Sequence, residues 1–137
     1  MRFTLSPLRA VAAALVLGLA GQVPIGGPVR ADEGFATLSS TQLATMLQSK
    51  AFFFVNVHIP YEGEIEGTDA NIAFDTIAEH LAALPTDKAA PIVLYCRSGR
   101  MSETAAKELS RLGYTNVSHL GGGMVDWQKN GRHIVVK

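Results

Sequence analysis

The chain has 137 residues, of which 47% are hydrophobic and 18% charged, so it fits one domain and is not a disordered acidic or basic tail. Its 12 Lys and Arg balance 12 Asp and Glu, which argues against a nucleic-acid partner, since such binders carry a basic surplus. Arg2, Arg9 and Arg30 lie in the first 31 residues, and every acidic residue follows them. Without that stretch, the body of the chain is mildly acidic.

Residues 1–31 have the pattern of a secretory signal peptide. A short positive stretch (1–9) precedes an apolar run (10–20), and Val29-Arg30-Ala31 offers small residues to a signal peptidase. The alternative is a membrane anchor, but a spanning helix needs about 20 mostly apolar residues and this run is little more than half of that. We therefore expect cleavage, a mature domain over residues 32–137, a periplasmic or secreted location, and no stable membrane anchor after cleavage.

The mature part alternates between helix and strand patterns. In chain order these predict a helix at 38–47 capped from within Ser39–Thr41, a strand at 51–57, a loop rich in Gly and acid at 60–71, a helix at 74–84 that stops at Pro85, a strand at 92–95, a helix along Met101, Ala105, Leu109 and Leu112 capped by Gly113, a strand at 116–120, a helix at 121–130, and a strand at 133–136. This alternation indicates a small three-layer α/β/α sandwich with a mostly parallel sheet.

Cys96 is the only cysteine, which excludes an internal disulfide and a multi-cysteine metal site. It stands at the carboxyl end of the predicted strand 92–95, where open α/β sheets bind ligands. A glycine-containing loop, a helix N-terminus, Arg97 and Arg100 all favour the thiolate, which is the nucleophilic form. The alternative is an inert buried cysteine, whose usual setting is apolar. The pattern therefore predicts an activated cysteine beside an anion-binding loop.

The spacing after Cys96 argues against a cysteine phosphatase. That chemistry uses a C-x5-R loop whose arginine grips the phosphoryl group, but Ser102 stands six residues after Cys96. The next arginine, Arg111, falls well down the predicted helix.

Two motifs resemble the single-domain rhodaneses, the thiosulfate sulfurtransferases. One is the strand, Cys-Arg-Ser-Gly-Arg-Met-Ser loop (96–102) and helix; the other is the tail 117–127, Val-Ser-His-Leu-Gly-Gly-Gly-Met-Val-Asp-Trp, followed by Asn130-Gly131. The resemblance covers about residues 36–137 and implies a rhodanese-like fold with Cys96 as the catalytic residue. It also implies that the rest of the loop binds the substrate: Arg97, Ser98, Gly99, Arg100, Met101 and Ser102.

The resemblance further implies a mechanism. The Cys96 thiolate would attack the outer sulfur of thiosulfate or another sulfane donor, forming a persulfide held by the loop amides and releasing sulfite. Cyanide or a thiol would then accept the sulfur. Arg97 and Arg100 would orient the anionic donor and stabilise the leaving charge. Neither a metal nor an organic cofactor is implied.

The chain departs from the family in three places. The family's second strand ends Asp-x-Arg, whereas this chain has Asn56-Val57-His58. Residues 62–68 only loosely match the family's Gly-His-Ile-Pro-Gly, and the loop arginine stands four rather than five residues after the cysteine. His58 is an accessory candidate that either faces the active-site mouth or, as we favour, hydrogen-bonds loop backbone in place of the family's arginine.

The remaining candidates are expected to be structural. Trp127 reads as a core anchor. Three histidines without ligand spacing are interpreted as surface or strand-edge residues: His80, His119 and His133. The acidic side chains of the glycine-rich loop favour a solvated surface over a cation site: Glu62, Glu64, Glu66 and Asp69.

Three functional hypotheses follow. The first is an exported sulfurtransferase with a small anionic sulfur donor and a thiol or cyanide acceptor. The second is a non-catalytic interaction module, against which the presence of Cys96 counts. The third is a sulfur-relay protein whose donor is a protein persulfide partner.

Overall fold

The computed structural model describes residues 34–137; the predicted signal peptide, residues 1–31, lies outside them. The described elements follow in chain order: β1 (Ala36–Leu38), α1 (Ser40–Leu47), β2 (Phe53–Asn56), β3 (Ala70–Asn71), the 3-10 turns η1 (Ile77–Glu79) and η2 (Leu81–Ala83), β4 (Ile92–Tyr95), α2 (Arg100–Arg111), β5 (Val117–Leu120) and α3 (Gly123–Lys129). In this part of the chain, no helix has the length and apolar character needed to cross a membrane.

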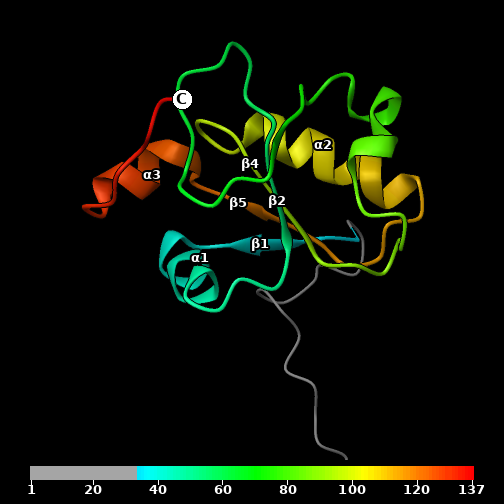
Figure 1. The fold of residues 1–137 in the computed structure, drawn as a ribbon, viewed down its shortest axis with the longest axis horizontal. Coiled ribbons are helices and arrows are strands. Elements are labelled where there is room, and N and C mark those ends of the chain that lie inside the picture. The colour runs from blue at the N-terminus through cyan, green and yellow to red at the C-terminus, as the bar shows by residue number, and fades with distance from the viewer. Residues whose placement is uncertain (1–33) are drawn as a thin grey trace, which may run out of the picture.

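The five strands form one parallel sheet in the order β1-β5-β4-β2-β3. Figure 1 shows α2 on one side of the strands and α1 on the other. Alternate residues of β4 enter two separate cores: Ile92 and Leu94 pack on the side of α2, while Val93 and Tyr95 pack with residues of α1 and α3. The predicted three-layer α/β fold is confirmed, and β4 lies at its centre.

The predicted cap of the first helix is also confirmed. The Ser39 hydroxyl accepts a hydrogen bond from the Gln42 amide at 3.1 Å, and the Gln42 side chain accepts one from the Ser39 amide at 2.9 Å. This reciprocal pair satisfies amides that the helix itself leaves free.

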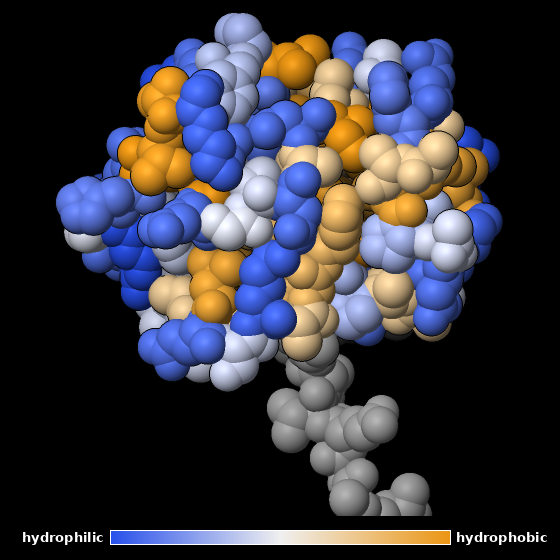
Figure 2. All heavy atoms as spheres, viewed as in Figure 1, coloured by the Kyte–Doolittle hydropathy of each residue, from blue (hydrophilic) through white to orange (hydrophobic). Residues whose placement is uncertain are grey.

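On the surface, Figure 2 shows apolar side chains in small groups among polar ones.

The predicted helix at 74–84 is wrong. Ile77 and Leu84 are buried in the core and Phe74 and Leu81 pack against it, but Ala78 is exposed and the segment forms the two 3-10 turns instead. His80 lies between the turns with φ −123° and ψ 27°, outside the helical region, and no side chain caps either turn. Tertiary packing of the apolar face therefore prevailed over the helical spacing.

The predicted strand at 133–136 is reduced to a single antiparallel bridge between Val135 and Glu64. There the Glu64 amide donates to the Val135 carbonyl at 2.7 Å, and the Val135 amide donates back at 2.8 Å. Two short strands, β1 and β3, were not predicted. They contain three and two residues, too few for a hydrophobic pattern to emerge.

Glu64 contradicts the expectation that the acidic loop is fully solvated, because the residue is only 2% exposed. Its carboxylate accepts hydrogen bonds from Tyr61 at 3.2 Å and Asn71 at 3.0 Å, and pairs with the Lys137 ammonium at 2.8 Å. The hydrogen bond from Lys137 lowers the pKa of the Glu64 carboxyl. This carboxylate thus ties the loop, β3 and the C-terminal segment together.

Replacing Glu64 with Gln should lower the free energy of unfolding at pH 7 by about 1–2 kcal/mol, since a buried acceptor of several bonds is lost. Because the pKa of the Glu64 carboxyl is lowered in the folded state, its ionised form stabilises the fold at pH values above the ordinary pKa, 4.5. This contribution disappears as the pH falls through the folded-state pKa of Glu64. The gap between parent and variant should therefore shrink from pH 7 to pH 3. Urea unfolding measures it, with Glu66→Gln as the exposed control; a gap independent of pH contradicts the assignment.

Candidate active site

Cys96 follows β4 directly and occupies the carboxyl end of the central strand. The residue is 1% exposed, and its sulfur accepts a hydrogen bond from the Gly99 amide at 3.0 Å. The 12-residue helix α2 begins at the next residue, Arg100. A negative charge on the sulfur is therefore met by an amide N–H and by the positive end of a helix dipole.

Gly99 is required by the turn that brings its amide to the sulfur. Its φ of 102° lies in the left-handed region, which L side chains rarely adopt. A Cβ atom there would also overlap the carbonyl oxygen of Gly121. The loop motif and the glycine motif after β5 are thus in direct contact.

The same glycine motif holds the cysteine loop from the other side. The Met124 amide donates to the Cys96 carbonyl at 2.9 Å, and the Val125 amide donates to the Arg97 carbonyl at 3.0 Å. A Cβ atom at Gly123 would overlap the Arg97 carbonyl, so only glycine permits this approach. The start of α3 therefore positions the loop by backbone hydrogen bonds.

Arg97 is exposed, and its guanidinium meets the Glu62 carboxylate at 3.3 Å. Glu62 also lies 3.0 Å from Nε2 of His58. A surface hollow beside this trio is lined by Glu62, Arg97, Met124, Val125, Gln128 and Ile134. Glu62 is exposed, as interpreted from sequence, and it is also the ion-pair partner of the Arg97 guanidinium.

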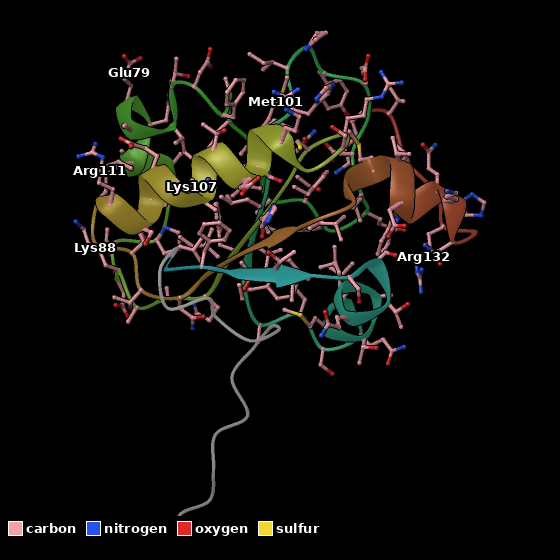
Figure 3. All side chains as sticks on the ribbon, turned by 180° about the vertical axis from the view of Figure 1, so that it is seen from behind. Glu79, Lys88, Met101, Lys107, Arg111 and Arg132 are labelled. Atoms are coloured by element: carbon pink, nitrogen blue, oxygen red, sulfur yellow. The ribbon has the colours of Figure 1, made fainter. Side chains whose placement is uncertain are left out.

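Arg100 lines a different hollow, with Phe74, Met101, Glu103 and Thr104. Met101 is half-buried against the core at the start of α2, where Figure 3 labels it. Ser98, between the two arginines, is exposed. The structure therefore places the predicted loop residues around Cys96 but does not bring both arginines into one hollow.

Asn56 and His58, the departures from the family pattern, organise the loop after β2. The buried Asn56 amide group donates to the Gly63 carbonyl at 3.1 Å, and its oxygen accepts from the His58 amide at 3.1 Å. The favoured interpretation, that the His58 side chain hydrogen-bonds loop backbone, is wrong: its ring contacts the Glu62 carboxylate instead. His58 thus reaches Arg97 through this carboxylate.

The interpretation of His119 as a surface or strand-edge residue is wrong, since it is 5% exposed. The unpredicted β1 pairs with β5, so β5 lies inside the sheet. Nδ1 of His119 is 2.9 Å from the Ser102 hydroxyl, which is itself 3.5 Å from the Cys96 sulfur. Burial lowers the pKa of His119, which favours the neutral ring. The sequence pattern of β5 alone could not reveal that His119 is buried beside Ser102, because this burial depends on the strands that flank β5 in the sheet.

Three structural interpretations are confirmed: His80 and His133 are exposed, and Trp127 is buried in the core with its indole N–H donating to the His133 carbonyl. Across residues 34–137, no three His, Cys, Asp or Glu side chains gather as a metal site would require.

The family model of the rhodanese-like domain matches residues 42–130. A tRNA uridine(34) hydroxylase of Erwinia tasmaniensis is 31% identical over 113 residues, which are 74% of this chain and 32% of that protein. The thiosulfate sulfurtransferase PspE of Escherichia coli is 34% identical over 71 residues, 50% of this chain and 68% of PspE. The chain thus spans about a third of the first relative and about two thirds of the second.

A similar architecture is present in solved structures. The rhodanese-related protein of Thermoplasma volcanium superposes with a TM-score of 0.62 at 25% identity, covering 74% of this chain and 98% of that one. The CoADR-RHD protein of Bacillus anthracis superposes with a TM-score of 0.65, also at 25% identity, over 77% of this chain and 19% of its own. With the cysteine loop, the glycine motif and the parallel sheet in place, the chain belongs to the rhodanese-like domain family.

Proposed function

We propose that the protein is a sulfurtransferase that moves sulfane sulfur from thiosulfate or a similar donor to a thiophilic acceptor through a persulfide on Cys96. The observation that carries the proposal is the hydrogen bond from the Gly99 amide to the buried Cys96 sulfur at the N-terminus of α2. The name of the E. coli relative, a thiosulfate sulfurtransferase, supports it.

Two displacements at sulfur complete the reaction. In the first, the Cys96 thiolate forms a bond to the outer sulfur of thiosulfate, while the S–S bond of thiosulfate breaks and its electron pair leaves with sulfite. In the second, cyanide or a thiolate attacks the outer sulfur of the persulfide, and the electron pair of that S–S bond returns to Cys96. The Gly99 N–H stabilises the negative sulfur in the free enzyme, and Arg97 attracts the anionic donor.

One observation favours a second candidate, sulfur relay from a protein persulfide. Glu62 is ion-paired with Arg97 at the candidate mouth and adds negative charge where a dianionic donor would approach. A protein persulfide carries less charge on its sulfur and meets less repulsion.

In either case we propose that residues 1–31 direct export, so that N-terminal sequencing of the mature protein would begin at Asp32.

Incubation of the purified protein with thiosulfate should add one sulfur atom to its intact mass. Cyanide should remove the added sulfur as thiocyanate. Cys96→Ser is the control and should remain unmodified. A parent protein whose cysteine alkylates rapidly but gains no sulfur from thiosulfate would contradict this donor and favour the relay; a cysteine that also resists alkylation would contradict both and favour a binding module.

Replacing Glu62 with Gln should lower the KM for thiosulfate about 1.4- to fivefold, because an exposed ion pair of about 0.2–1 kcal/mol no longer competes for Arg97. The matched control is Glu66→Gln, which removes the same charge from the same loop but lies at a different hollow. Steady-state kinetics with both variants measure the effect. Equal changes in the two variants would mean that only net charge matters and would contradict the specific role of Glu62.

A further inference from the structure

A line of hydrogen-bonding side chains runs from the candidate nucleophile to the sheet edge. The Cys96 sulfur lies 3.5 Å from the Ser102 hydroxyl, which lies 2.9 Å from Nδ1 of His119; Nε2 of His119 lies 3.2 Å from the Thr37 hydroxyl. Cys96, Ser102 and His119 are buried, whereas Thr37 on β1 is exposed. Figure 3 shows β1 and α2, which carry the two hydroxyls, from the side facing away in Figure 1.

The number of protons decides what Ser102 offers to the sulfur. Its hydroxyl has one proton, and its oxygen lies near three groups: the sulfur, Nδ1 of His119, and the Gly99 carbonyl, which only accepts. If the His119 proton is on Nε2, Nδ1 accepts and draws the Ser102 proton away from the sulfur. If it is on Nδ1, His119 donates to Ser102, and the Ser102 proton is left for the Gly99 carbonyl, to which it donates at 3.1 Å, or for a thiolate, whose negative charge makes it the stronger acceptor.

We infer that His119 is a positioning residue for the proposed sulfur transfer: by donating from Nδ1 to Ser102, it directs the Ser102 hydroxyl toward the Cys96 thiolate. Thr37 supports this tautomer by donating to Nε2. The inference rests on the proposed role of Cys96 as nucleophile, but it concerns the thiolate before any sulfur donor arrives.

The Cys96 thiol can then lose its proton through Ser102, His119 and Thr37, and the number of protons on these groups balances. The S–H bond breaks, its electron pair stays on sulfur, and its proton passes to the Ser102 oxygen while the former Ser102 proton passes to Nδ1. The Nε2 proton moves to Thr37, whose own proton goes to water. Each hydroxyl keeps one proton, the ring stays neutral, and the Ser102 hydroxyl ends as a donor to the thiolate, because its new proton came from the sulfur.

The surroundings of His119 favour a neutral ring that acts through its tautomer. The Phe35 ring packs edge-on against it at 5.4 Å. Of the charged groups that act on it, Glu103 and Lys107 of α2 have opposite effects and pair with each other at 3.4 Å. Desolvation is therefore the main influence, and it disfavours the imidazolium.

The test is the pH profile of Cys96 alkylation by iodoacetamide in the full chain, followed by intact mass. Cys96 is the only cysteine, so the reaction reports this site alone. His119→Phe keeps the ring but removes both nitrogens, and should move the midpoint of the profile about one pH unit upward, slowing alkylation at pH 7 about tenfold. His119→Asn places an amide near Nδ1 and should stay within about threefold of the parent.

His119→Gln is the matched control, because its amide reaches toward Thr37 rather than Ser102, so it should behave like His119→Phe. A purely structural role would lower the melting temperature of the variants and leave the midpoint unchanged, which would overturn the inference. So would equal midpoints for Asn and Gln, a comparison that holds even if the Phe variant does not fold. Alkylation needs no sulfur donor, so failure of thiosulfate transfer would affect the proposed function and not this result.

Discussion

The candidate site depends on backbone hydrogen bonds between the cysteine loop and the start of α3, which are distant in sequence. The amides of Met124 and Val125 bind the carbonyls of Cys96 and Arg97, and this approach is open only because residue 123 is glycine. The cysteine loop therefore has a rigid support that does not depend on its own side chains. Arg97, Ser98 and Arg100 can then point outward while the sulfur stays fixed.

The sulfur lies between two different electrostatic environments. On the buried side its neighbours are neutral donors and acceptors, the Gly99 amide and the Ser102 hydroxyl. On the exposed surface of the loop, the Arg97 guanidinium pairs with Glu62, and this carboxylate also links Arg97 with His58. Neutral dipoles in a buried site stabilise an anion without the desolvation that a buried ion pair suffers. In the proposed sulfur transfer, stabilisation of the thiolate and choice of donor would thus be carried by separate groups.

Sequence patterns were sufficient for the strand–loop–helix unit around Cys96, since a buried strand, a glycine and an amphipathic helix each leave a local signature. They were insufficient for His119 because its burial depends on β1, whose three residues pair with a strand about 80 positions later. The same limit explains Glu64, whose partner Lys137 lies at the far end of the chain. The prediction for segment 74–84 failed for another reason: the apolar spacing identified side chains that do reach the core, such as Ile77, but it did not determine whether the backbone forms an α-helix or two 3-10 turns.

The strand order also restricts when the domain can fold. β1 is the first strand of the described residues and pairs with β5, the last of them in chain order, which separates β1 from β4. Until residues 117–120 have left the ribosome, β1 has no neighbour, and the α1 side of the sheet lacks Leu120, Met124 and Trp127. An emerging chain therefore cannot complete the sheet and its α1-side core before β5 is available, and until then its apolar faces remain open to chaperones.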